Sequence, residues 1–246
     1  MPPIQRLALI TDFGGTGPYV GQVKLRLSGL SPEIPVIDLI SDLVPFRPDL
    51  GAYLLPALVR DMPRGTLYVC VVDPGVGGDR RALIVEADGN IFVGPDNGLF
   101  AVLARSASDA KVRRVAWRPA ELSASFHGRD LFAPVAAMLA TGKFLDAEEI
   151  DPKSMEGMDW PHDLWRVIYA DHYGNLMSGI RASQLNRTQV MHVGGHRLAF
   201  SRTFCEAQPS QAFWYENALG LVELAVNQGR ADRVLGLAPG DPINTD

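Results

Sequence analysis

The 246-residue sequence is poor in cysteine, in net positive charge and in long apolar runs. Its two cysteines, Cys70 and Cys205, form no C-x-x-C pair, which argues against a zinc or dithiol redox site. The formal net charge of -5 gives no basic surface for neutralising phosphates, so nucleic acid is not an expected partner. No apolar run approaches the roughly 20 residues that span a bilayer, and MPPIQRLALITDFGG lacks the cleavage pattern of a signal peptide. These absences predict a cytoplasmic protein with no membrane partner.

Motifs for phosphates and metals are missing as well. There is no G-x-x-x-x-G-K-[ST] and no G-x-G-x-x-G, so the glycine-rich loops are not typical phosphate cradles. His192 and His196 are four residues apart, a spacing that on a helix would suggest a metal pair. The intervening Val193-Gly194-Gly195 favours a hairpin turn instead. We expect no metal site.

The first 150 residues alternate strand-like apolar runs with helical stretches. This order favours an α/β layered domain with a mostly parallel sheet covered on both faces. Asp88-Gly89-Asn90 suits a tight hairpin turn between the runs ALIVEA and IFVG. The predicted strands cover 6–11, 34–40, 66–73 and 112–117, and the predicted helices cover 19–30, 49–60, 98–106 and 130–140.

Beyond this region the sequence changes in character. Residues 146–160 are acidic, include Pro152 and Gly157, and lack apolar periodicity, which is typical of a domain boundary. Short apolar runs separated by Gly, Asn and Ser turns then follow. They predict a small antiparallel β-barrel domain over 160–246, after an N-terminal α/β domain over 1–150.

Four charged loop motifs fall at or near strand ends or helix starts in the first domain. They are TDFG with Asp12, VVDPGVGGDRR with Asp73, GPDNG, and FHGRD with His127. Ligands of parallel sheets bind beyond the carboxyl ends of the strands, so these loops are candidates for one site. Each motif alone is better explained as a helix cap, a turn or a surface ion pair.

The residue types in these loops point to water chemistry. Asp73, Arg80 and His127 could position a water and stabilise the charge that develops as its proton leaves. Asp12 is a short carboxylate beside glycines, suited to accept hydrogen bonds from a vicinal diol. Turn and helix-terminus roles remain open for both sets. The same holds for YADHYGN in the second domain, which offers a carboxylate, a ring and an amide but also reads as a strand-turn-strand element.

Taken in order, the motifs resemble those of the S-adenosylmethionine hydroxide adenosyltransferase family, whose relatives include fluorinating and chlorinating enzymes. The resemblance runs along nearly the whole chain, through ITDFG, PYVGQVK, VVDPGVGGDRR, GPDNGL, FHGRDLFAPVAA, DHYGN and LVELAVNQG. It implies attack of water on the ribose C5′ of S-adenosyl-L-methionine, yielding adenosine and methionine without a metal or redox cofactor. It also implies a homotrimer with active sites between subunits.

The resemblance assigns roles by position. Asp73, Arg80 and His127 match the catalytic set that handles the water, with Arg80 chosen over Arg81 by its offset from Asp73. The halogenating relatives lack this set, so its retention favours hydrolysis. The matching substrate-binding residues are Asp12, Phe46, Phe126, Asp171, Tyr173, Asn175 and Asn217.

Several positions depart from the family pattern. Gly17, Leu25 and Asp42 stand where the family usually has Asp, Gly and His, and Ser178-Gly179 stands for Thr-Asn. Ala218 replaces a serine whose hydroxyl could help to hold the methionine carboxylate. A non-catalytic binder of adenosine or adenosylmethionine is therefore the first alternative, and an adenosylmethionine-dependent halogenase is the second.

Overall fold

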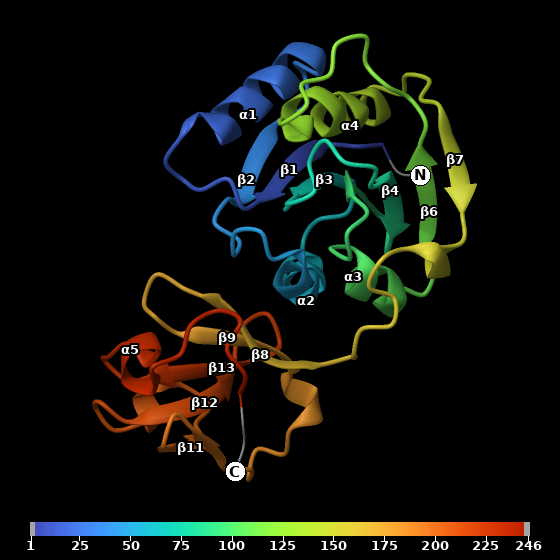
Figure 1. The fold of residues 1–246 in the computed structure, drawn as a ribbon. Helices are drawn as coiled ribbons and strands as arrows, with labels where there is room; N and C mark the ends of the chain where they lie inside the picture. The colour runs from blue at the N-terminus through green and yellow to red at the C-terminus, as the bar shows by residue number, and fades with distance from the viewer. Residues whose placement is uncertain (1–2, 244–246) are drawn as a thin grey trace. The chain divides into compact units, whose positions relative to one another are not determined.

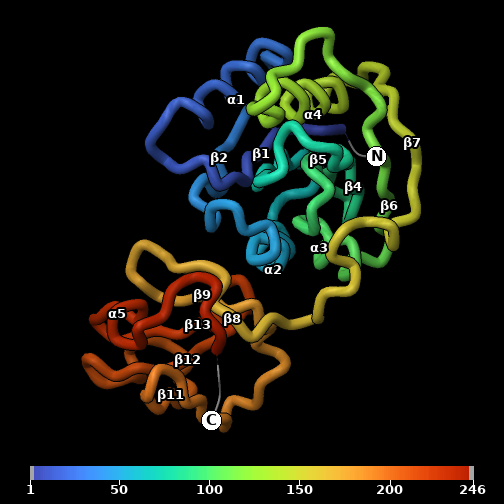
Figure 2. Tube along the Cα trace, in the orientation of Figure 1, coloured from blue at the N-terminus to red at the C-terminus, as the bar shows by residue number. Residues whose placement is uncertain are grey.

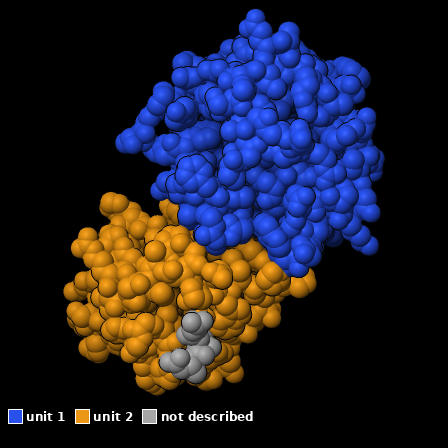
Figure 3. All heavy atoms as spheres, in the orientation of Figure 1, with its two compact units in different colours: residues 1–52, 61–160 blue, residues 53–60, 161–246 orange. Residues whose placement is uncertain are grey.

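The computed structural model describes residues 3–243, which form two compact units. The first unit runs up to residue 52 and from 61 to 160, and the second comprises residues 53–60 and the chain from 161 onward (Figure 3). None of the helices between residues 3 and 243 has the length and apolar character that crossing a membrane requires. The predicted domain limits, 1–150 and 160–246, stay predictions, and their outer ends at 1–2 and 244–246 lie outside the described residues.

A seven-stranded sheet forms the centre of the first unit, with the strand order β2-β1-β3-β5-β4-β6-β7. The chain through these strands can be followed in Figure 2. The strands are β1 (Arg6–Thr11), β2 (Val36–Ile40), β3 (Thr66–Val71), β4 (Ala82–Ala87), β5 (Asn90–Pro95), β6 (Lys111–Val115) and β7 (Ala147–Ile150). The helices of this unit are α1 (Pro18–Leu30), α3 (Ala101–Ser106) and α4 (Ala133–Ala140), and a π-helical turn (Gly128–Phe132) leads into α4. A further helix, α2 (Pro48–Val59), begins in this unit, and its residues from 53 onward belong to the second.

The prediction of a mostly parallel sheet is wrong, because this sheet is mixed. Strands β2, β1, β3 and β5 pair in parallel, whereas β5–β4, β4–β6 and β6–β7 are antiparallel. The cause is the predicted hairpin: Asp88 and Gly89 both have positive φ, 50° and 77°. A two-residue turn of this kind reverses the chain at once and makes its two strands antiparallel neighbours.

Helices cover both faces of the sheet, as expected. Figure 1 shows α1 and α4 on one side and α3 on the other. The core on the α1 and α4 side is mainly aliphatic and includes Leu27 of α1 and Val135 of α4. The opposite face is aromatic, with the rings of Tyr68 and Phe92 stacked 4.9 Å apart and Phe100 beside them. Burial on both faces explains why the central strands are continuous apolar runs.

Residues 146–160, expected to be a boundary, are ordered parts of the first unit. Their start forms the edge strand β7, and a short 3-10 turn (Pro152–Ser154) follows. Trp160 packs against the positive-φ glycines Gly98 and Gly157, and its carbonyl accepts a 2.6 Å hydrogen bond from Arg105. The segment lacks apolar periodicity because it follows the edge of the unit instead of crossing the core.

A second sheet organises the second unit, with the order β10-β11-β12-β13-β9-β8. Its strands and one helix are β8 (Leu164–Ala170), β9 (Leu176–Arg181), β10 (Met191–Val193), β11 (His196–Phe200), β12 (Ala212–Glu216), β13 (Leu221–Val226) and α5 (Ala231–Leu235). The predicted hairpin at Gly194-Gly195 is confirmed: it joins β10 to β11, so His192 and His196 lie on paired strands. The main core on one face gathers around Trp214 and Leu224.

The expected antiparallel barrel is also corrected. The sheet is a curled half-barrel, and β11 and β12 within it run parallel. Residues 201–211 connect these two strands, and a connection of this length lets the chain return in its original direction. The other neighbouring strands of the sheet pair antiparallel.

Gly94 in β5 supplies a stability test of the first unit. A Cβ there would overlap the carbonyl oxygen of Cys70 and lie 2.8 Å from the Phe100 ring. We expect Gly94→Ala to lower the free energy of unfolding by about 2–4 kcal/mol, because overpacking a close-packed core forces backbone shifts. Thermal unfolding measures the effect.

Gly29→Ala is the matched control. Gly29 lies in α1, and a Cβ there would meet nothing within 4 Å. Alanine is the better helix former, so the control should be neutral or stabilising by up to about 1 kcal/mol. Equal melting temperatures for the two variants would contradict the packing described for β5.

Candidate active site

The loops after β1 and β3 open on a cavity of about 240 Å³ in the first unit. Asp12 follows β1 and Asp73 follows β3 by one further residue, and these strands are parallel neighbours in the sheet. Both carboxylates therefore emerge at the same sheet edge, and His127 reaches the cavity from the start of the π-helical turn. The lining consists of Asp12, Phe13, Tyr19, Pro45, Phe46, Val71, Asp73, Val76, Ser125, Phe126, His127 and Gly128.

Asp73, Arg80 and His127 form one connected group at this cavity. The Arg80 guanidinium binds Asp73 through two hydrogen bonds, one of them 2.7 Å from Nε to Oδ1. Its Nη2 also lies 2.9 Å from Nδ1 of His127. Arg80 packs over the ring of Phe132, 5.4 Å from the ring centroid. Asp73 and His127 line the cavity. Arg80 lies outside the lining and orients both through its hydrogen bonds.

The contact between Arg80 and His127 fixes the protonation of the imidazole. A guanidinium can only donate hydrogen bonds, so Nδ1 of His127 must accept and cannot carry a proton. His127 is therefore neutral, with its proton on Nε2. Burial lowers the pKa of His127 below its usual value, and the Arg80 charge lowers it further, against the opposing effect of Asp73. The imidazole thus offers its one N–H as a donor.

Asp12 holds a strained loop on another wall of the cavity. Its Oδ2 accepts a 3.0 Å hydrogen bond from the backbone N–H of Phe46. Phe46 has a φ of 64°, which is unfavourable by about 1 kcal/mol for a residue with a side chain, and the residue is 73% exposed. Burial raises the pKa of the Asp12 carboxyl; the Phe46 N–H partly offsets this, and the nearby Asp73 charge adds to it.

Phe126 belongs to an aromatic cluster. Its ring contacts Phe13 and Tyr19 edge-on, at centroid distances of 5.8 and 5.3 Å. Arg129 lies 5.0 Å above the same ring and is bound to Asp130 and Gln22. Phe13, Tyr19 and Phe132 were not predicted as site residues, although they lie within the motifs ITDFG, PYVGQVK and FHGRDLF.

Other charged residues of the four loop motifs have structural partners. Arg81 pairs with the buried Asp96 and donates to the Ser154 carbonyl oxygen, and it does not line the first cavity. The side chain of Asn97 donates to the Val72 carbonyl and accepts from the backbone N–H of Leu99. GPDNG is thus a structural turn here, as the simpler reading of that motif predicts.

The second unit brings Asp171, Tyr173 and Asn175 to a separate cavity of about 630 Å³. Asp171 accepts hydrogen bonds from the backbone and side-chain nitrogens of Asn175, at 2.8 and 2.9 Å. Tyr173 is 73% exposed, with His172 edge-on to its ring. The remaining lining comes from Phe204, Tyr215, Val226, Gln228, Gly229 and Arg230.

Asn217 lies outside the lining of this cavity and is bound within the unit. Its Oδ1 accepts from the backbone N–H groups of Leu219 and Leu221, and its Nδ2 donates to Glu223 at 2.7 Å. Glu223 in turn accepts a 2.6 Å hydrogen bond from Tyr215, which does line the cavity. Tyr215 and Glu223 were not predicted as site residues. Nothing in LVELAV marks its glutamate as buried.

Two departures from the family pattern can now be located. Ser178 is buried, and its hydroxyl donates to the Val222 carbonyl oxygen at 2.7 Å, so it contributes to packing. Ala218 is exposed in the turn that ends at Gly220. Neither residue lines the cavity of the second unit.

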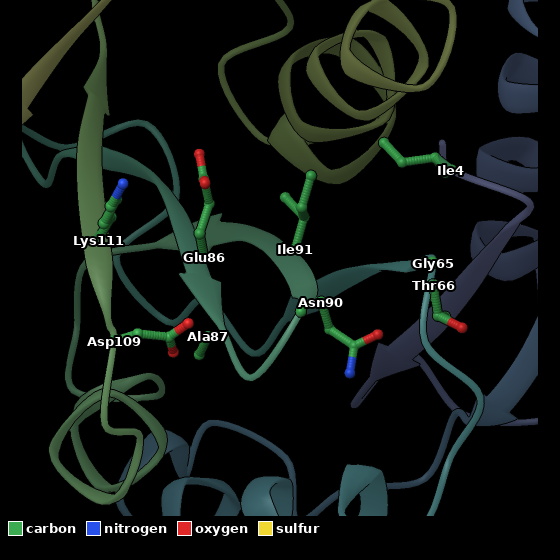
Figure 4. Close-up of a pocket in the computed structure, with 10 residues that line it drawn as sticks. Ile4, Gly65, Thr66, Glu86, Ala87, Asn90, Ile91, Asp109 and Lys111 are labelled. Carbon is green, nitrogen blue, oxygen red and sulfur yellow. The ribbon is translucent and has the colours of Figure 1, made fainter. Parts of the chain in front are cut away.

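A third cavity of about 220 Å³ lies at the opposite end of the first unit's strands. Lys111, Glu86 and Ile91 form one cross-strand row there, and Figure 4 shows their side chains pointing to the same side. No sequence-predicted site residue lines this cavity. Across residues 3–243, no cluster of three or more His, Cys, Asp or Glu side chains has an arrangement that could hold a metal ion.

Comparisons with known proteins match both units. Residues 7–150 match the model of the SAM hydroxide adenosyltransferase N-terminal domain, and residues 165–244 match that of its C-terminal domain. An (R)-S-adenosyl-L-methionine hydrolase from Salinispora arenicola is 36% identical over 251 residues, which cover 96% of each chain. A fluorinase from Actinopolyspora mzabensis is 24% identical over 90% of each chain.

The fold has a solved counterpart. The crystal structure of an uncharacterized conserved protein from Thermotoga maritima superposes with a TM-score of 0.85 and 29% identity, covering 96% of this chain and 97% of that one. The two family models together span most of the sequence, including the loops that carry Asp12, Asp73, Arg80 and His127. The chain therefore belongs to the SAM hydroxide adenosyltransferase family.

Proposed function

We propose that this protein hydrolyses S-adenosyl-L-methionine to adenosine and L-methionine. The observation that carries the proposal is the connected group of Asp73, Arg80 and His127 at the wall of the first cavity. The similarity to an (R)-S-adenosyl-L-methionine hydrolase over 96% of the chain supports it. Fluorinases are the more distant relatives, at 24% identity.

The reaction needs little beyond a well-placed water. The water oxygen forms a bond to the ribose C5′ as the bond from C5′ to sulfur breaks and its electron pair returns to sulfur. The cationic sulfonium becomes the neutral thioether of methionine, and the water proton leaves. Since the sulfonium is already a good leaving group, alignment of the water accounts for most of the work. The proposed reaction uses no metal or cofactor.

The three residues divide this task. Asp73 can accept a hydrogen bond and a proton from the water through the lone pairs that Arg80 leaves unused. His127, as the Nε2–H tautomer, can donate to the water oxygen and stabilise its developing hydroxide character. Arg80 orients both groups from behind the wall.

The substrate-binding assignments belong to the same proposal. Asp12 accepts hydrogen bonds from the ribose diol, and Phe46 and Phe126 form apolar walls around the substrate. In the second unit, Asp171 meets the methionine ammonium, and Tyr173 and Asn175 meet the adenine; the Asn217 loop adds a further contact. Asn217 would act by shaping its turn, because both ends of its side chain are already bonded. We further propose a cytoplasmic homotrimer whose sites form between neighbouring subunits.

Incubation of the purified protein with S-adenosyl-L-methionine in isotopically labelled water tests the reaction. We expect adenosine carrying one labelled oxygen at C5′, together with unlabelled methionine, read by mass spectrometry. Arg80→Ala should reduce kcat by about 100-fold or more, because the water-handling groups lose their fixed orientation. Arg114→Ala removes an exposed arginine paired with Glu148 and serves as the control with unchanged rate.

The outcomes separate the alternatives. Tight binding without adenosine release over hours would select a non-catalytic binder, the reading favoured by Ala218. Chloride-dependent formation of 5′-chloroadenosine would select a halogenase. Full activity of a folded Arg80→Ala variant would remove the group of three from the mechanism.

The pH dependence tests the tautomer of His127. Its pKa is lowered from the usual 6.5, so protonation needs a lower pH than for a free imidazole. The acid limb of kcat/KM that reports loss of the neutral imidazole should therefore lie below pH 6.5. An NMR titration, with the His127 signal assigned by its loss in His127→Gln, measures the same group directly. A midpoint above 6.5 would contradict the proposed arrangement.

A further inference from the structure

Glu223 is the most deeply buried carboxylate of the second unit's sheet, with 2% of its surface exposed. It lies on β13 directly opposite Tyr215 on β12. Its side chain occupies the face away from the Trp214 and Leu224 core, because neighbouring residues of a strand point to opposite faces. That face also carries Phe213 and Ala225, which pack with Phe204 and Tyr215. Glu223 thus lies behind a wall of the second cavity.

The hydrogen bonds around an ionised Glu223 carboxylate have only one consistent direction. The amide of Asn217 cannot be flipped, because its Oδ1 already accepts from two backbone N–H groups. Its Nδ2 must therefore donate to Oε2 of Glu223. An ionised carboxylate only accepts, so the Tyr215 hydroxyl must donate its single proton to Oε1, at 2.6 Å.

This direction determines what Tyr215 offers to the cavity. Its proton is committed to Glu223, and the phenolic oxygen is left with acceptor lone pairs. Asp171, which also lines the cavity, is a carboxylate and a further acceptor. The cation of the lining, Arg230, already donates from Nε and Nη2 to Asp232 and from Nη1 to the His172 carbonyl. Asp171 and Tyr215 therefore both present hydrogen-bond acceptors to the cavity, and each needs a donor from the ligand.

We propose that Glu223 is a positioning residue that holds Tyr215 as a hydrogen-bond acceptor, so that this cavity selects a ligand group bearing N–H donors. The inference rests on the proposed function, since S-adenosyl-L-methionine carries two such groups, the amino-acid ammonium and the exocyclic amine of adenine. Burying a carboxylate is unfavourable, as the raised pKa of Glu223 reflects. A glutamine of the same shape would avoid that cost but would reverse the hydrogen bond to Tyr215.

Glu223→Gln tests the proposal because it changes hydrogen-bond direction with little change in shape. Asn217 still needs an acceptor, so the new amide must turn its oxygen toward Asn217 and its nitrogen toward Tyr215. Tyr215 then accepts from the amide and points its proton into the cavity. We expect affinity for the N–H-bearing ligand to fall about tenfold or more, since a donor would then face a donor.

Calorimetry with three probes identifies the ligand group. S-Adenosyl-L-homocysteine, whose neutral thioether is not hydrolysed, carries both nitrogens. 5′-Methylthioadenosine lacks the ammonium, and 5′-methylthioinosine lacks the exocyclic amine as well. Selective loss of S-adenosyl-L-homocysteine binding would assign Tyr215 to the ammonium; loss for the first two probes, with the inosine analogue spared, would assign it to the adenine amine. Equal changes for all three probes would overturn the proposal and leave Glu223 a purely structural residue.

Tyr215→Phe supplies the matched control. In that background the hydroxyl is absent, so Glu223→Gln should no longer discriminate among the probes, and the double-mutant cycle isolates the coupling. Undiminished discrimination in the double variant would refute the role of Tyr215.

A measurement without ligand keeps this inference separate from the proposed function. The ¹³Cζ resonance of labelled Tyr215, assigned by its loss in Tyr215→Phe, should shift in Glu223→Gln because the hydroxyl changes from donor to acceptor. If the wild type binds none of the probes, the proposed function fails and this shift alone decides the hydrogen-bond direction. An unmoved resonance in a folded Glu223→Gln variant would overturn the inference.

Discussion

The ion pair between Asp73 and Arg80 is the interaction on which the first cavity depends. Asp73 reaches the sheet edge because the buried strand β3 ends two residues earlier. Arg80 returns to it after a glycine-rich loop in which Gly77 has a φ of 83°, and a Cβ there would overlap the Ala124 carbonyl oxygen. The side chains of both partners are about nine-tenths buried, so removing either one would leave an unpaired charge out of water. Through Nη2, the same pair also dictates which nitrogen of His127 carries the proton.

Much of this arrangement could be predicted because it follows from local rules. The apolar run over 66–73 indicated a strand, which is observed from Thr66 to Val71, and Asp88-Gly89-Asn90 indicated the hairpin that the backbone angles confirm. The meeting of Asp12 and Asp73 follows from parallel strands that share one edge. The choice of Arg80 over Arg81, in contrast, came only from the resemblance, since adjacent arginines are indistinguishable by composition. Their partners, Asp73 and Asp96, appear only in the folded chain.

What could not be predicted depends on register and long-range pairing. The acidic stretch from Ala147 to Ile150 gave no strand signal, yet it closes the sheet as β7 by pairing with β6. The parallel pairing of β11 with β12 needs a long connection whose path no local pattern encodes. Glu223 is buried because β12 and β13 align it with Tyr215, and a shift of one residue would turn it to the other face. Such pairings are properties of the whole sheet.

The position of Arg80 behind the wall has an electrostatic consequence for a cationic ligand. A guanidinium in direct contact with the cavity would repel a sulfonium, and this repulsion is stronger in a partly buried site than in bulk water. In this structure the Arg80 charge is compensated by Asp73 and capped by a neutral imidazole, so the surface nearest the ligand carries no net positive charge. With the Asp12 carboxylate also in the lining, the local field favours the approach of a cation and the departure of a neutral thioether. The buried Arg80 cation thus orients Asp73 and His127 without exposing its charge to the ligand.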